Sequence, residues 1–424
     1  MADITSQDGP MLAADGTPLK KSLARALRNQ KMRALMLIAP LLVFVLISFI
    51  VPIFNMLTRS VDNDIVANTL PETVPLLAAW DASAGELPDE EIYAAFARDM
   101  IKAVAEKNHT KLGTRLNYEQ TGISSLFRKS GRKIKKWDPV ADAPFKEKLI
   151  DLHEGWGELQ TWKVIQTHAR TVTPGYFLNA VDMQLTPDGA AAQPEDKRIL
   201  IKLFGRTLWM SLVIMSACIV LGYPVAWILA NLPMRQANIL MILVLLPFWT
   251  SLLVRTSAWK VLLQQQGVIN NILVWLGMLN DDGRLVLINN QTGTIIAMTH
   301  ILLPFMILPM YSVMQTIPPT YLRAAKSLGA TNWTAFWRVY FPQSVPGIGA
   351  GSILVFILAI GYYITPEIVG GTKGVFISNR IAYHISSSLN WGLAAALGTI
   401  LLVVVLGLYW CYDKIVGIDN VKLG

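Results

Sequence analysis

Six long apolar segments constrain the fold of this chain more than any other feature of its sequence. About 20 consecutive apolar residues make a helix that crosses a bilayer, and such a helix satisfies its own backbone hydrogen bonds. Only 16% of the 424 residues are charged, whereas ordinary soluble domains carry about 25%. We therefore predict an all-α membrane protein with six transmembrane helices, at residues 34–56, 208–230, 239–259, 294–314, 348–364 and 393–412.

The placement of positive charge predicts the topology of these helices in the inner (plasma) membrane. Lysine and arginine concentrate in cytoplasmic loops, and a basic cluster stands directly before the first apolar segment. An even number of spans then puts both termini in the cytoplasm. The same signal accounts for the net charge of +8, so we expect no binding to nucleic acid. The cytoplasmic cations are Lys20, Lys21, Arg25, Arg28, Lys31, Arg33, Arg235, Arg323, Lys326, Arg338 and Lys414.

The pattern divides the chain into four regions. Residues 1–33 form a polar cytoplasmic tail, 34–57 the first helix, 58–202 an extracytoplasmic insertion and 203–424 the membrane core. The insertion mixes charges of both signs and is long enough for one small domain. Within it, residues 90–107 carry apolar side chains at every fourth position, which predicts an amphipathic helix. The candidate core residues of the insertion are Trp137, Trp156 and Trp162.

A polar stretch, residues 320–346, interrupts the apolar half of the chain. Thr320 and Thr331 can each cap the start of a helix. Gly329, between them, can take the left-handed conformation that ends a helix. Pro342 should end the second helix, because the residue before a proline is pushed out of the α region. We therefore predict two short helices that meet at a glycine elbow.

The second of these helices carries aromatic side chains at positions i, i+3, i+4 and i+7, which predicts a single aromatic face. Such a face could dock onto a partner protein. It could also lie among lipid headgroups, where Trp and Tyr are common. The expected cytoplasmic position favours docking. The face consists of Trp333, Phe336, Trp337 and Tyr340.

The spacing within the elbow resembles the coupling loop of importer-type ABC transporter permeases. That loop reads Glu-Ala-Ala, three residues, Gly, nine residues, then Ile, any residue, Leu and Pro. Here Arg323-Ala324-Ala325 precedes Gly329, and Val339-Tyr340-Phe341-Pro342 follows it. Arg323 departs from the pattern, so a salt bridge made by that glutamate is not implied. The resemblance implies that Arg323, Ala324, Ala325, Gly329, Trp333, Phe336, Trp337 and Pro342 couple the membrane core to an ATPase.

Further motifs resemble the first permease subunit of the spermidine/putrescine ABC importers. They are residues 247–256 with Gly267 and Asn270, residues 302–309, residues 361–371, and Asn379 with residues 390–392. The resemblance runs from about Leu203 to the C-terminus, roughly half of the chain. Tyr362 departs from it, since the family often has an acidic residue there. The resemblance implies a type I ABC importer permease fold, here with an extracytoplasmic domain inserted after the first helix.

The same resemblance implies a transport subunit that moves a polyamine across the bilayer by alternating access. A second permease subunit, a dimer of cytoplasmic ATP-binding-cassette ATPases and an extracytoplasmic solute-binding protein would complete the importer. Aromatic faces and carboxylates suit a polycation. The arginine, tyrosine and tryptophan candidates can instead be interfacial anchors, as these residues often are. The candidate substrate-path residues are Trp249, Arg255, Tyr362, Tyr363, Glu367, Asn379 and Trp391.

No motif for enzyme chemistry stands in the sequence. There is no Gly-x-x-x-x-Gly-Lys-Ser/Thr phosphate loop, so this chain is not the ATP-hydrolysing subunit. The five histidines lack metal-ligand spacing, and no Gly-x-Ser-x-Gly nucleophile motif occurs. We expect no cofactor and no metal. The alternatives that stay open are an importer for another organic amine or an organic anion, an ion-coupled secondary transporter and a membrane scaffold.

Overall fold

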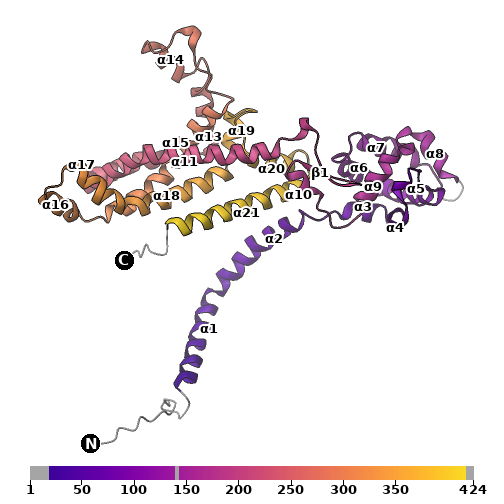
Figure 1. Ribbon diagram of the computed structural model, residues 1–424, viewed down its shortest axis with the longest axis horizontal. Helices are drawn as coiled ribbons and strands as arrows, with labels where there is room; N and C mark the ends of the chain where they lie inside the picture. Colours follow the sequence, from indigo (N-terminus) through magenta and orange to yellow (C-terminus); the bar gives the residue numbers. More distant parts are fainter. Residues whose placement is uncertain (1–18, 139–142, 417–424) are drawn as a thin grey trace, which may run out of the picture. The chain divides into compact units, whose positions relative to one another are not determined.

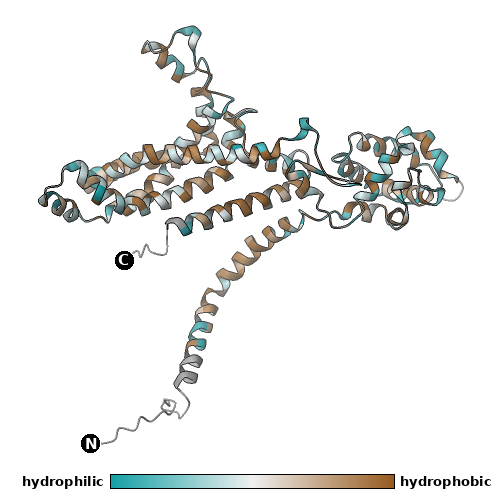
Figure 2. Cartoon of the chain, in the orientation of Figure 1, coloured by the Kyte–Doolittle hydropathy of each residue, from teal (hydrophilic) through white to brown (hydrophobic). Residues whose placement is uncertain are grey.

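The computed structural model describes residues 19–138 and 143–416, and nearly all of its regular structure is helical (Figure 1). The chain divides into two units, Met1–Thr58 and Arg59–Gly424. In the first unit, α1 (Leu19–Val45) continues through a π-helical turn (Leu46–Ile50) into α2 (Val51–Thr58). Figure 2 shows that most of this unit's helix is hydrophobic, and its large apolar side chains from Leu27 to Phe54 are exposed, as expected of a helix that lies in lipid or against another chain. The first predicted membrane helix is thereby confirmed as a helix.

The second unit begins with a small helical insertion. Among the described residues of the insertion, eight helices and one antiparallel hairpin follow one another, joined by short 3₁₀ turns. They are α3 (Asp64–Thr69), α4 (Thr73–Ala79), α5 (Glu90–Ala105), α6 (His109–Asn117), α7 (Ile123–Ile134), α8 (Phe145–Leu152), α9 (Leu159–Thr167), α10 (Gly175–Ala180), β1 (Met183–Thr186) and β2 (Gly189–Ala192).

The interior of the insertion is aromatic and hydrogen-bonded. The predicted amphipathic helix is confirmed as α5, and its Phe96 ring lies 4.6 Å from the ring of Trp156 and 5.3 Å from that of Trp162. Both indoles are fully buried. Trp156 Nε1 donates a hydrogen bond to Ser130 Oγ at 2.8 Å, and Trp162 Nε1 donates one to the Trp156 carbonyl at 3.0 Å. These two hydrogen bonds satisfy the indole N–H groups, which need a partner when a tryptophan is buried. Trp137 lies at the edge of this core, where it is partly buried.

The membrane core follows the insertion. Its three central helices, α11, α15 and α18, pack along one another (Figure 1). The helices of the core are α11 (Leu200–Asn231), α12 (Met234–Leu245), α13 (Leu252–Leu262), α14 (Val268–Trp275), α15 (Gln291–Gln315), α16 (Pro319–Ser327), α17 (Asn332–Ala335), α18 (Phe341–Gly361), α19 (Ile364–Val369), α20 (Ile377–Ser386) and α21 (Trp391–Val416).

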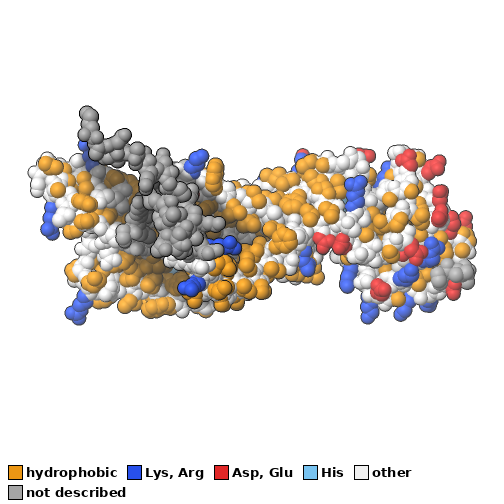
Figure 3. Space-filling model, turned by 90° about the horizontal axis from the view of Figure 1, so that it is seen from below, with side chains coloured by type: hydrophobic (Ala, Val, Ile, Leu, Met, Phe, Trp, Pro, Cys, Tyr) orange, Lys and Arg blue, Asp and Glu red, His pale blue; other side chains and the backbone are white. Residues whose placement is uncertain are grey.

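Close packing between α15 and α18 depends on small residues. A Cβ on Gly347 would lie 3.0 Å from Met310 Cα, and one on Gly351 would lie 3.1 Å from the Met306 carbonyl oxygen. Glycines therefore bring the two backbones together, as is common between membrane helices. The outer surface of these helices is largely apolar, whereas acidic and basic side chains spread over the insertion (Figure 3).

The predicted span at residues 239–259 is wrong as a single straight helix. Helical segments Met234–Trp249 and Leu252–Leu262 meet at a bend of 92°. Pro247 lies at the start of a 3₁₀ turn (Leu246–Trp249), and Thr250 and Ser251 are extended, which ends the first helix. Among the described residues, five helices are long and apolar enough to cross a membrane, or six when the bent pair counts as one.

Candidate functional site

Two interruptions in apolar helices meet in the membrane core. The first is the 92° bend before α13, and the second is the break between α18 and α19, at residues 362–363. The two helices that follow these breaks contact each other, because the Thr256 hydroxyl on α13 lies 3.1 Å from the Thr365 hydroxyl on α19. Irregular backbone at membrane depth is tolerated only inside protein or along a water-filled path. In transporters such breaks commonly form binding sites.

Side chains of α20 satisfy the backbone that the second break frees. Ser378 Oγ donates a hydrogen bond to the Ile360 carbonyl at 2.6 Å, and Asn379 Nδ2 donates to the Tyr363 carbonyl at 2.9 Å. The Ile360 carbonyl lies in the last turn of α18, where carbonyls lack an intrahelical partner. The Tyr363 carbonyl also accepts the Glu367 N–H of α19 at 3.0 Å. The break is therefore held in place by two specific side chains rather than left loose.

Asn379 also fixes the only carboxylate of this region. Its Nδ2 donates to Glu367 Oε2 at 2.6 Å, while its Oδ1 accepts the Phe376 backbone N–H at 2.9 Å. Glu367 lies on α19 and is exposed. One of its oxygens is thus oriented by Asn379, and the other is available to a cation. Three of the predicted path residues, Tyr363, Glu367 and Asn379, are brought together here.

Arg255 lies on α13 beside this break. Its side chain is half-buried, and its Nε and Nη1 atoms have no hydrogen-bond partner among the described residues. A neighbouring contact joins α13 to α15, since Trp259 Nε1 donates to His300 Nδ1 at 3.1 Å. Sequence reasoning did not select Trp259 or His300, because a lone histidine in an apolar span gives no spacing signal.

Two predicted path residues lie apart from this cluster. Trp249, on the 3₁₀ turn before the bend, has 71% of its side chain exposed. Trp391 begins α21, and the Arg59 guanidinium lies 5.8 Å from its ring centroid. It lines a cavity of about 490 Å³ together with residues of α3 and α6 of the insertion. Neither tryptophan contacts Glu367 or Arg255 in the interactions of the described residues.

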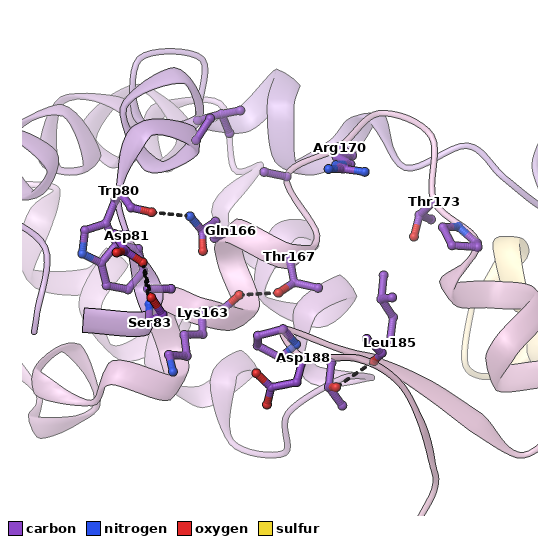
Figure 4. Close-up of a pocket in the computed structure, with 18 of the residues that line it drawn as sticks. Trp80, Asp81, Ser83, Lys163, Gln166, Thr167, Arg170, Thr173, Leu185 and Asp188 are labelled. Carbon is purple, nitrogen blue, oxygen red and sulfur yellow. Dashed lines mark hydrogen bonds between the residues drawn. The ribbon is translucent and has the colours of Figure 1, made fainter. Parts of the chain in front are cut away.

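A cavity of about 780 Å³ lies in the insertion (Figure 4). Gln166 lines this cavity, and its Nε2 donates hydrogen bonds to the carbonyls of Leu77 at 2.7 Å and Trp80 at 2.8 Å. Its charged side chains are of both signs, and none of the predicted path residues lines it. These charged residues are Asp81, Lys163, Arg170 and Asp188.

The elbow, formed by α16 and α17, lies at one end of the membrane core, away from α13 and α19 (Figure 1). Gly329 has φ +90°, and a Cβ there would meet no atom within 4 Å, so the backbone conformation and not the space requires glycine. Thr331 caps the next helix, accepting the Thr334 N–H at 3.3 Å. The predicted cap at Thr320 is wrong: α16 begins at Pro319, whose fixed φ suits the first turn of a helix.

The prediction that Pro342 ends the second helix is also wrong. A continuous helical segment runs from Asn332 to Gly361. It contains a π-helical turn, Phe336–Tyr340, in which the Phe341 N–H bonds to the Phe336 carbonyl. A proline normally clashes with the carbonyl four residues earlier. In the wider turn the backbone N–H bonds to the carbonyl five residues earlier instead of four. This change lets the helix continue through Pro342.

The predicted aromatic face is split between two surfaces. Trp333 and Trp337 are exposed, by 72% and 43%, and their rings lie 5.5 Å apart. Phe336 instead packs 6.2 Å from Tyr223 of α11 and 5.9 Å from the buried Tyr340. Only the tryptophan pair is available to a partner.

The other predicted coupling residues lie on α16. Arg323 and Ala324 are exposed, and Ala325 is half-buried. Arg323 forms no ion pair within the part of the chain that the structure describes.

Comparisons with known proteins give these features a family. Residues 202–416 match the model of the binding-protein-dependent transport system inner membrane component. The spermidine/putrescine transport system permease protein PotB of Escherichia coli K12 is 38% identical over 208 residues, covering 48% of this chain and 74% of PotB. The inner membrane ABC transporter permease protein YdcU of the same organism is 34% identical, covering 57% of this chain and 80% of YdcU.

Among solved structures, a bacterial ABC transporter involved in the import of the acidic polysaccharide alginate is similar at 21% identity. The match covers 54% of this chain and 81% of that chain, with a TM-score of 0.42. The family match begins at residue 202, so the helices of the insertion lie before it. From residue 202 onward, the chain belongs to the family of binding-protein-dependent transport system inner membrane components, the permease subunits of ABC importers.

Proposed function

We propose that this chain is one permease subunit of an ATP-driven importer of polyamines such as spermidine and putrescine. The observation that carries the proposal is the 38% identity to PotB, which extends over 74% of that permease. PotB is named for spermidine and putrescine transport. The chain itself has no phosphate loop, so a separate ATPase must supply the energy.

The break between α18 and α19 is the proposed substrate contact in the path. Glu367 can pair with one ammonium group, and the rings of Tyr362 and Tyr363, the two residues of the break, can take a second through cation–π attraction. Asn379 positions the carboxylate through the 2.6 Å hydrogen bond. A fixed carboxylate pays less ordering entropy on binding than a mobile one.

The elbow is the proposed attachment of the motor. The exposed pair Trp333 and Trp337, with the helix α16, would dock into an ATPase subunit, and closure of the ATPase dimer would move the continuous helix 332–361 as a lever. The proposed importer also contains a second permease subunit and an extracytoplasmic solute-binding protein. In the proposed importer, both termini and the elbow lie in the cytoplasm and the insertion lies outside.

A second candidate function is the import of an organic anion. Arg255 favours it, because its Nε and Nη1 atoms, beside the helix breaks, have no hydrogen-bond partner in the part of the chain that the structure describes. An anion could accept from them. The Glu367 carboxylate and the identity to PotB favour the polyamine.

Whole-cell uptake separates the two candidates. Cells that lack their own polyamine importers and express this chain with its companion subunits should accumulate radiolabelled spermidine. Unlabelled putrescine should compete with it, and citrate should not. Glu367→Gln should lower spermidine uptake more than Arg255→Gln does. If citrate competes for uptake, and Arg255→Gln lowers uptake more than Glu367→Gln does, the transported solute is an organic anion instead.

A further inference from the structure

One aromatic ring joins the insertion to the last membrane helix. Tyr176 of α10 lies against the backbone of Gly392, the second residue of α21. A Cβ on Gly392 would lie 2.7 Å from Tyr176 Cε1 and closer still to Cζ and Cε2. Non-bonded carbon atoms make favourable contacts only at about 3.5–4.0 Å. Glycine is therefore required at this position by the ring that covers it.

A charged side chain of the insertion also holds the Tyr176 ring. The guanidinium carbon of Arg115, on α6, lies 4.6 Å from the ring centroid, and the Arg115 side chain is only 6% exposed. Its Nη1 pairs with Glu119 Oε1 at 2.7 Å, and its Nε donates to Asn63 Oδ1 at 2.9 Å. Ion pairs and hydrogen bonds in such a buried network fix geometry strongly. The ring cannot move without disturbing this network.

The membrane core holds the same region through apolar packing. Around Tyr176, buried side chains of four helices form one cluster, and their removal from water favours keeping the helices together. Its buried members are Tyr176 and Ala180 of α10, Leu200 and Leu203 of α11, Ile377 of α20, and Leu393, Ala396 and Leu397 of α21.

Two polar contacts add to this packing. Asp182, directly after α10, accepts the backbone N–H groups of Leu200 and Ile201, each at 2.9 Å, at the start of α11. The Tyr118 hydroxyl of the insertion donates to the Ser388 carbonyl, just before α21. The insertion thus contacts the starts of both α11 and α21 through buried or half-buried groups.

We propose that Tyr176 and Gly392 are positioning residues that make the insertion and the starts of α11 and α21 one rigid body. Packed interiors switch between discrete arrangements rather than deform smoothly. A solute-binding protein that docks on the insertion therefore acts directly on the membrane helices. This inference rests on the proposed function, because it assumes a binding protein and a transport cycle.

The first test uses the complete importer in proteoliposomes, with its second permease, its ATPase subunits and its solute-binding protein loaded with spermidine. Gly392→Ala should abolish the stimulation of ATP hydrolysis by the loaded binding protein and leave the basal rate in place. Gly398→Ala is the matched control on the same helix, because a Cβ at Gly398 meets no atom within 4 Å. It should behave as the natural chain does.

A second-site variant distinguishes this joint from general damage to α21. Tyr176→Leu lacks the Cε and Cζ atoms that a Cβ at position 392 would meet but still fills the apolar cluster, so it should restore part of the stimulation to Gly392→Ala. Tyr176→Phe keeps those atoms and should not restore it. Full stimulation in Gly392→Ala, or a loss that Tyr176→Leu does not relieve, would overturn the proposal. If Gly392→Ala fails to assemble, the two double variants alone decide.

A distance measurement tests the joint without any transport. Spin labels at Lys129→Cys on α7 and Lys373→Cys near α20, in a Cys411→Ser background, report the position of the insertion against the core. The distance distribution should be narrow in the natural chain and in Gly398→Ala, and broad in Gly392→Ala. Equal widths in all three would contradict a rigid joint. Absence of polyamine uptake by the natural importer would instead refute the proposed function and leave this readout intact.

Discussion

The insertion and the membrane core bury their interiors by different means. The insertion fills its centre with Phe96, Trp156 and Trp162, and it binds the polar edges of those indoles to Ser130 and a backbone carbonyl. The core brings α15 and α18 together through Gly347 and Gly351. The difference follows from the solvent. Water drives apolar side chains of the insertion inward, whereas lipid offers no such drive and leaves packing between backbones to hold the helices.

The largest expected effect concerns the aromatic centre of the insertion. Trp156→Ala should destabilise the insertion by about 3–5 kcal/mol, because it removes a fully buried indole and leaves a cavity. Limited proteolysis of the membrane-bound protein should then cut within the insertion and leave the fragment after residue 200 intact. Trp249→Ala, at an exposed indole, is the matched control and should not change the cleavage pattern. Parallel loss of both regions would mean that they do not have separate interiors.

The converse change is made in the core. Gly351→Leu should destabilise the helix pair α15–α18 by about 1–3 kcal/mol through overpacking, because Met306 already occupies the space. Thermal unfolding in detergent measures this loss, in a Cys411→Ser background, through the reaction of the buried Cys218 with a thiol reagent. Gly407→Leu, where a Cβ meets no atom within 4 Å, serves as the control. If Gly351→Leu loses no more thermal stability than Gly407→Leu, close approach of the two backbones does not stabilise the core.

The elbow contains Gly329, a glycine of the core that is required by its backbone conformation and not by close packing. Gly329→Val places a β-branched residue at φ +90° and should cost roughly 1–2 kcal/mol locally. Spermidine uptake should be lost while ATP hydrolysis continues, since α16 would no longer meet the next helix at the same angle. Gly329→Asn should retain more uptake, because Asn tolerates the left-handed region. Normal uptake in an assembled Gly329→Val importer would remove the lever role from the elbow.

The smallest expected effect is the pH dependence of the insertion. Burial lowers the pKa of His168 below its ordinary value of 6.5, although Glu119 partly opposes this. The unfolded chain therefore binds the proton more readily than the folded one, and protonation favours unfolding. Stability should be complete above pH 6.5 and should fall as the pH drops below it.

His168→Gln provides the control for this titration. Proteolysis rates of the insertion should rise between pH 6.5 and 5.5 in the natural chain and stay flatter in the variant. An equal rise in both would assign the dependence to another group.

The sequence predicts regular periods well and local exceptions poorly. Apolar length located the membrane helices, and a four-residue period located α5. The bend after Trp249 was missed because only two polar residues, Thr250 and Ser251, separate the apolar residues on its two sides. Continuation through Pro342 was missed because a π-helical turn leaves no signal in residue type. The contact of Asn379 with Glu367 joins two helices across a turn, and only the folded chain reveals it.

Uptake by purified components tests the central claim most directly. Proteoliposomes that contain this chain, its second permease and its ATPase subunits should accumulate radiolabelled spermidine when ATP is inside them and the loaded solute-binding protein is outside. Accumulation should stop when this chain is omitted or when ATP is replaced by a non-hydrolysable analogue. Uptake that continues without ATP, or that proceeds for an organic anion but not for spermidine, would contradict the account.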